Sequence, residues 1–127
     1  MALEFTAEIP GAAELCDQFG GFPSFADAKA EFSAGPDGTG SLKVWSYFIG
    51  RDGNYDVGKP IVVIFSFDGI ATVSLTKSDG AIYLDNLTVG KVDGLYETSW
   101  ESAYGADGVV HARQMRITLQ SGDKAED

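Results

Sequence analysis

The chain has 127 residues, of which 44% are apolar, and its nineteen acidic and nine basic side chains give a formal net charge of −10. This length and apolar content suffice for one domain with a hydrophobic core. The acidic excess argues against nucleic acid and anionic lipid as ligands, and it favours either a basic protein partner or simple solubility.

The single cysteine, Cys16, excludes a disulfide within the chain and gives no reason to place the protein in an oxidising compartment. The first sixteen residues contain three glutamates and no basic residue before an apolar run, unlike a secretion signal. No stretch approaches the roughly 20 apolar residues of a membrane-spanning helix. We therefore expect a cytoplasmic protein that does not bind membranes.

One short helix is expected near the N-terminus. Pro10 suits a first helical turn, and apolar residues recur at helical spacing until Gly20 and Gly21 end the pattern. Because Cys16 lies within the apolar stripe, we interpret it as a packing residue and not as a nucleophile. The stripe consists of Ile9, Ala12, Leu15, Cys16 and Phe19.

The rest of the chain predicts short strands joined by many turns, since it is rich in glycine and aromatic residues. The apolar run IVVIFSF (61–67) predicts a central buried strand, and Asp68 with Gly69 predicts a hairpin turn into a returning strand. Residues 50–60 are expected to form a polar turn. About seven strands are predicted, at 27–35, 41–49, 61–67, 70–80, 81–89, 94–103 and 108–120.

Turn signals at this regular spacing predict a single all-β domain over residues 1–127, with residues 120–127 as a frayed tail. The strands are expected to be mostly antiparallel and to form a sandwich or a strongly curved sheet, with the helix packed on it. Residues 41–49 carry large side chains on both faces. That strand is therefore either covered on both sides or presents aromatic residues to a partner.

The last predicted strand changes the face on which its apolar residues lie. They occupy even positions up to Ala112 and odd positions from Met115 onward. One extra residue near Arg113 and Gln114, a β-bulge, would turn both sets inward. His111, the only histidine, and Arg113 would then face solvent, which avoids the cost of roughly several kcal/mol of burying an uncompensated charge.

Few residues could support nucleophilic or metal chemistry. Nothing in the sequence brings Cys16 and His111 together as a nucleophile and its base, and no zinc-ligand spacing is present. Residues 52–58 begin like a calcium loop, but the twelfth position is Val63, which cannot supply the bidentate carboxylate. We therefore predict no metal site.

Paired carboxylates leave a hydrolase open as an alternative. Glu97 and Glu101 lie four residues apart on one predicted strand, as do Asp27 and Glu31. A glycosidase needs two such groups about 5 to 10 Å apart across a cleft, so this spacing permits that chemistry without specifying it. No glycine-rich phosphate-binding loop is present. We assign no catalytic residue and no cofactor, and a structural β module is the third alternative.

Three segments together resemble the bacterial immunity protein 50 family of polymorphic toxin systems. They are FGGFPSFADAKA (19–30), IVVIFSFDGIATVSL (61–75) and YGADGVVHARQMRI (104–117), and their order and approximate separation agree along most of the chain. Family members often carry a histidine before the Asp-Ala pair of the first segment, where this chain has Ala26. Any role of that imidazole is therefore not carried over, whereas Asp27 remains.

The resemblance implies a non-catalytic protein, made beside a toxin, that binds the toxin and blocks it in the producing cell. An acidic domain could fill a basic cleft of such a toxin, with aromatic residues as buried anchors. Exposed edge strands or the aromatic residues of 43–49 could also support a homodimer. The predicted partner-binding residues are Asp27, Trp45, Tyr47, Tyr96, Glu97, Trp100 and Glu101.

Overall fold

The computed structural model describes residues 9–19, 25, 28–49, 55–75, 82–102 and 107–121, which form one helix and six strands. The elements are α1 (Ala12–Phe19), β1 (Lys29–Ala34), β2 (Gly40–Ile49), β3 (Tyr55–Leu75), β4 (Ile82–Val92), β5 (Leu95–Ser102) and β6 (Gly108–Ser121). All paired strands are antiparallel, and the sheet closes into a barrel in the order β1-β2-β3-β6-β5-β4.

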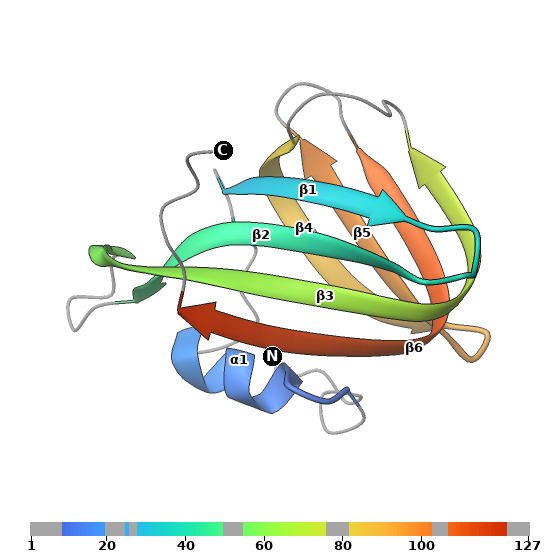
Figure 1. Ribbon diagram of the computed structural model, residues 1–127, viewed down its shortest axis with the longest axis horizontal. Helices are drawn as coiled ribbons and strands as arrows, with labels where there is room; N and C mark the ends of the chain where they lie inside the picture. The colour runs from blue at the N-terminus through green and yellow to red at the C-terminus, as the bar shows by residue number, and fades with distance from the viewer. Residues whose placement is uncertain are drawn as a thin grey trace.

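The barrel consists of two crossed layers that share their two longest strands (Figure 1). The front layer contains β1, β2, the first part of β3 and the last part of β6. Both β3 and β6 then bend sharply and continue in the back layer, beside β5 and β4. The prediction of an antiparallel all-β fold with one short helix is confirmed, but the seven strands and the sandwich are wrong.

The difference in strand number arises at Asp68 and Gly69, where the predicted hairpin turn is wrong. Pairing with β6 continues through this point, since Asp68 lies opposite Gln114 and Ile70 opposite Ala112. The backbone bends at Gly69, whose φ is 65°, a conformation that glycine adopts without strain. The strands predicted at 61–67 and 70–80 are therefore parts of one strand, β3, as far as Leu75, and residues 76–80 lie outside the described residues. That strand also includes residues 55–60 of the predicted polar turn, whereas residues 50–54 lie outside the described residues.

The predicted change of face in the last strand is confirmed. Ala112 and Met115 are both buried, and Arg113 and Gln114 between them are exposed. The extra residue is not located there, however, because the register shift between β3 and β6 leaves Ala71 of β3 without an opposite residue. The extra residue therefore lies on β3, the partner strand of β6, at the bend.

The core fills the space between the two layers. The rings of Phe25 and Phe65 meet edge to face, with their centroids 6.1 Å apart, and the ring centroids of Phe32 and Trp100 lie 5.5 Å apart. Inward side chains alternate with outward ones along each strand. The largest fully buried side chains are Trp100, Phe25, Phe65, Leu15, Leu42, Ile61, Leu84, Val44, Val63 and Val110.

Helix α1 packs against β2 and β6 through the predicted apolar stripe, of which Ile9, Ala12 and Leu15 are buried. The Ile117 N–H donates a hydrogen bond of 2.8 Å to the Pro10 carbonyl oxygen and ties the start of this segment to β6. Gly11 is required at this contact, because its φ is 90° and a Cβ there would overlap the Ile117 carbonyl group. No helix in the described part of the chain is long and apolar enough to cross a membrane.

We predict that Gly11→Ala destabilises the fold by about 2–4 kcal/mol, through left-handed strain and overlap with backbone that cannot move freely. Urea denaturation measures this change. Gly90→Ala is the matched control, because a Cβ at Gly90 meets nothing within 4 Å, and its effect should stay within about 0.5 kcal/mol. Equal stability of the two variants would contradict the proposed contact.

Candidate functional site

The predicted partner-binding residues do not form one surface. β2 and β5 occupy opposite positions in the six-stranded ring, so their outward side chains point away from each other. Trp45 and Tyr47 lie outward on β2, whereas Glu97 and Glu101 lie outward on β5. Asp27 lies outside the described residues. The aromatic and acidic candidates therefore belong to two separate faces.

Trp100 is a core residue, and its predicted role as a surface anchor is wrong. Its exposed fraction is 2%, it packs against Phe32, and a Cβ at Gly108 would overlap its indole ring. Its Nε1 has no hydrogen-bond partner among the described residues. The sequence contained the signal for this position, since Glu97 and Glu101 mark the odd positions of β5 as outward and so turn Trp100 inward. Tyr96 has the same parity and packs partly against the core.

The aromatic residues of β2 form part of the front layer. Trp45 lies opposite Lys29 of β1 and Val62 of β3, and Tyr47 lies opposite Pro60. The Lys29 Nζ lies 5.9 Å from the Trp45 ring, within range of a cation–π interaction. Trp45 and Tyr47 are partly buried by these neighbours. Their neighbours therefore include both a charged side chain, Lys29, and apolar ones, Val62 and Pro60.

The back layer carries an acidic face, which we define as the outward residues Asp85, Thr88, Glu97, Ser99 and Glu101 of β4 and β5. The Thr88 and Ser99 hydroxyls lie 2.8 Å apart and link the two strands. The register between β4 and β5 shifts between Leu84 and Asn86, so Asp85 has no residue opposite it. Asp85 is exposed and lies next to Asn86, which is paired with Glu101. Both of these carboxylates are exposed, and no described lysine or arginine lies within ion-pair distance of either.

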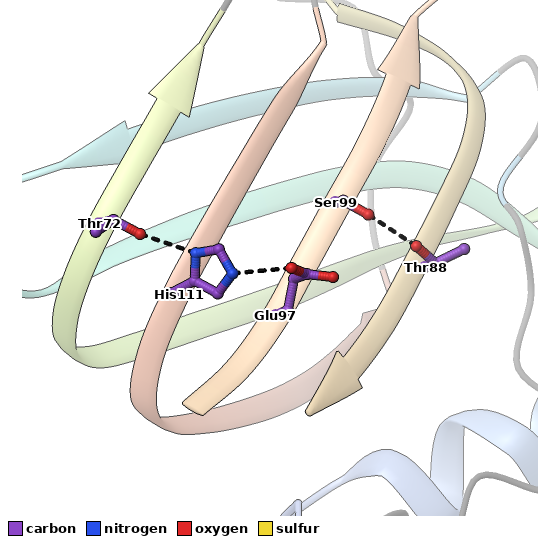
Figure 2. Close-up of polar contacts among 5 residues, drawn as sticks. All are labelled: Thr72, Thr88, Glu97, Ser99 and His111. Atoms are coloured by element: carbon purple, nitrogen blue, oxygen red, sulfur yellow. Dashed lines mark hydrogen bonds and ion pairs between the residues drawn. The ribbon is translucent and has the colours of Figure 1, made fainter. Parts of the chain in front are cut away.

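His111 of β6 links Glu97 of the acidic face to Thr72 of β3, so these side-chain contacts run across three strands (Figure 2). Its Nε2 lies 2.8 Å from Glu97 Oε2, and its Nδ1 lies 2.8 Å from Thr72 Oγ1. An ionised carboxylate only accepts hydrogen bonds, so Nε2 donates to Glu97. In the neutral ring, Nδ1 then accepts the hydrogen bond of the Thr72 hydroxyl. The alternation of apolar residues in the last strand predicts a solvent-facing histidine but neither of these contacts, which depend on the registers of β5, β6 and β3.

A hydroxyl, an imidazole and a carboxylate in this order are the three groups of a nucleophilic hydrolase site. Thr72, His111 and Glu97 lie on the outward side of a sheet, however, and none of them lines the pocket at the bend. Glu97 and Glu101 are four residues apart on one strand, about 13 Å. That separation exceeds the roughly 10 Å that two-carboxylate glycosidases allow.

The pocket at the bend has a volume of about 750 Å³ and lies beside the start of α1. Among the described residues that line it, Asp68 is the one carboxylate, and Arg113 and Arg116 line it from β6. The described part of its lining therefore does not contain the second carboxylate that the hydrolase alternative requires. Its lining residues are Pro10, Ser66, Phe67, Asp68, Tyr96, Arg113, Gln114, Met115, Arg116 and Thr118.

Cys16 does not meet His111, because α1 packs on β2 and β6 while His111 lies beyond the bend, in the back layer. Burial raises the pKa of the Cys16 thiol, and the nearby charge of Asp17 raises it further. At neutral pH the thiol is therefore protonated and weakly nucleophilic. Among the described residues, no group of three His, Cys, Asp or Glu side chains is placed to hold a metal ion.

Comparisons of the chain with protein-family models, with curated proteins and with solved structures gave no match. The resemblance to immunity protein 50 rests on the three sequence segments alone. One of them, residues 61–75, coincides with the part of β3 that includes the bend.

We predict that His111 and Glu97 are energetically coupled. A double-mutant cycle of His111→Ala and Glu97→Ala, followed by urea denaturation, should give a coupling of about 0.5–1 kcal/mol, as for partly exposed polar side-chain pairs. The same cycle with Glu101→Ala in place of Glu97→Ala is the control and should give a coupling near zero. Equal coupling in both cycles would contradict a specific contact.

Proposed function

We propose that the protein is a non-catalytic binding domain that neutralises a cognate bacterial toxin, as the resemblance to immunity protein 50 implies. The observation that carries this proposal is the acidic face. It presents Asp85, Glu97 and Glu101 on the outward side of β4 and β5, and Asp85 and Glu101 are exposed without a described lysine or arginine to neutralise them. This face is suited to a basic surface of a protein partner.

The net charge of the chain supports the same partner class. With a formal charge of −10, the molecule attracts basic proteins over distances of about the Debye length, roughly 8–10 Å at moderate salt. Such attraction raises association rates, and this helps a protein that must capture a toxin quickly. A toxin that acts on nucleic acid has a basic cleft, which an acidic face complements.

The test is titration of the protein with the toxin encoded beside it, inactivated in its catalytic residues, at low and moderate salt. We expect tight binding that weakens as salt rises. Glu101→Gln should slow association by about two- to tenfold at low salt, since charged groups at an interface act chiefly on the association rate. Glu31→Gln, which removes the same charge from the outward face of β1, is the matched control and should leave the rate nearly unchanged.

A toxin that fails to bind at either salt concentration would overturn the proposal. Equal effects of Glu101→Gln and Glu31→Gln would keep toxin binding but remove the acidic face from the interface.

A second candidate function is acyl hydrolysis, which the order Thr72–His111–Glu97 favours. Under this candidate, the wild-type protein hydrolyses p-nitrophenyl acetate at least about 100-fold faster than Thr72→Val, because general-base activation of a nucleophile contributes at least that much. Under the binding proposal, we expect equal rates for the wild-type protein, Thr72→Val and His111→Gln. The absorbance of released p-nitrophenol decides between the two functions.

A further inference from the structure

The last five residues of β3, Ala71–Leu75, form a strand that pairs with a described strand on one edge only. We call this segment the β3 arm. It pairs with residues 108–111 of β6 on one side, whereas the pairing of β3 with β2 ends at Phe67. Figure 1 shows the arm at the outer edge of the back layer, beyond the bend. All five of its residues are exposed, and none of the described strands pairs with its other edge.

The β3 arm lacks the features that protect the other strand edges of the barrel. Its sequence, ATVSL, contains no charged residue and no proline. By contrast, β6 carries Arg113 at the bend and Arg116 in its front-layer part, where the Ile117 N–H also donates to the Pro10 carbonyl oxygen. Strand β1 carries Glu31. Unprotected edges pair readily with another strand. The irregular pairing at the start of the arm ends by Thr72, after which the register with β6 is regular.

Apolar exposure is concentrated on the same segment. Among the described residues, four large apolar side chains are more than one third exposed, and two of them lie on the β3 arm, Val73 at 39% and Leu75 at 37%. Val73 lies opposite the buried Val110, so it points toward the inner side of the back layer. An added strand would cover these side chains as well as complete the backbone hydrogen bonds.

Charge decides which occupant fits. Pairing of two β3 arms would join the back layers of two molecules that each carry a charge of −10. A five-residue edge, about 17 Å long, is too short to supply a stable interface on its own. A basic partner removes both difficulties, because it can pair with the arm and neutralise the acidic face of the same layer. The two features are continuous, since β5 lies two strands, about 10 Å, from the arm.

We propose that an extended, basic segment of the toxin pairs with the β3 arm as an additional strand of the back layer. This inference rests on the proposed function and adds the mode of recognition to it. The strand adds backbone hydrogen bonds and buries Val73 and Leu75, while the adjoining surface of the toxin covers Glu97 and Glu101.

The test compares two variants in the toxin titration. Val73→Lys places a charge on the β3 arm, and Val92→Lys places the same charge at a valine that is 44% exposed at the end of β4. We expect Val73→Lys to weaken binding at least about tenfold, as loss of a central interface contact does, and Val92→Lys to weaken it no more than about threefold. Both valines are exposed, so the urea midpoints of the variants should match that of the wild-type protein.

Hydrogen exchange of the wild-type complex provides a second measurement that needs no variant. Amides of residues 71–75 that exchange rapidly in the free protein should become protected when the toxin binds.

Equal binding by the two variants, together with unchanged exchange in the arm, overturns strand pairing while toxin binding stands. Absence of binding by the wild-type protein overturns the proposed function itself. A wild-type dimer in sedimentation that Val73→Lys abolishes identifies a second copy of the chain as the occupant and also overturns the inference.

Discussion

The shared bend of β3 and β6 is the feature on which the rest of the structure depends. Because both strands turn at the same place, one part of each lies in the front layer and the other part lies in the back layer. The sheet therefore closes with six strands. The pairing of β3 with β2 ends at the bend, so no described strand pairs with the second edge of the β3 arm. It also separates the residues of β6 that contact α1 from those that contact β5.

Two backbone N–H groups at the bend have hydrogen-bond partners that stabilise it. The Gly69 N–H donates to Asp68 Oδ1 at 2.8 Å, and the Ile70 N–H donates to the Gly38 carbonyl oxygen at 2.9 Å. The second bond ties the turn between β1 and β2 to the corner of the barrel. The Arg113 side chain lies over Gly69, where a Cβ would crowd its aliphatic stem. Glycine thus meets two requirements at this position, a positive φ and a close side-chain approach.

Much of this architecture follows from local sequence patterns, and the remainder does not. Alternation predicts which residues face inward on each strand, and helical spacing predicts α1, since both are properties of a single segment. An Asp-Gly pair, however, forms a hairpin turn when the flanking strands pair with each other and a bend when a third strand pairs with both. At Asp68 and Gly69 the third strand is β6, and no local signal in residues 61–75 identifies it.

The same distinction applies to the candidate site. The outward positions of Glu97 and Glu101 are predictable from alternation, and the inward position of Trp100 follows from the same pattern. The contacts of His111 with Glu97 and Thr72 are not predictable, because each requires the register between strands that are distant in sequence. A register one residue different would turn the imidazole to the other side of the sheet.

The separation of aromatic and acidic candidates changes the kind of binding that the back layer can support. Aromatic anchors often supply the slow dissociation of a tight complex, but Trp45 lies on the opposite layer beside Lys29, and Trp100 is in the core. Carboxylates alone chiefly accelerate association. Slow dissociation therefore requires contacts that exclude water. On the back layer, the β3 arm offers them through its open backbone edge and the exposed side chains of Val73 and Leu75.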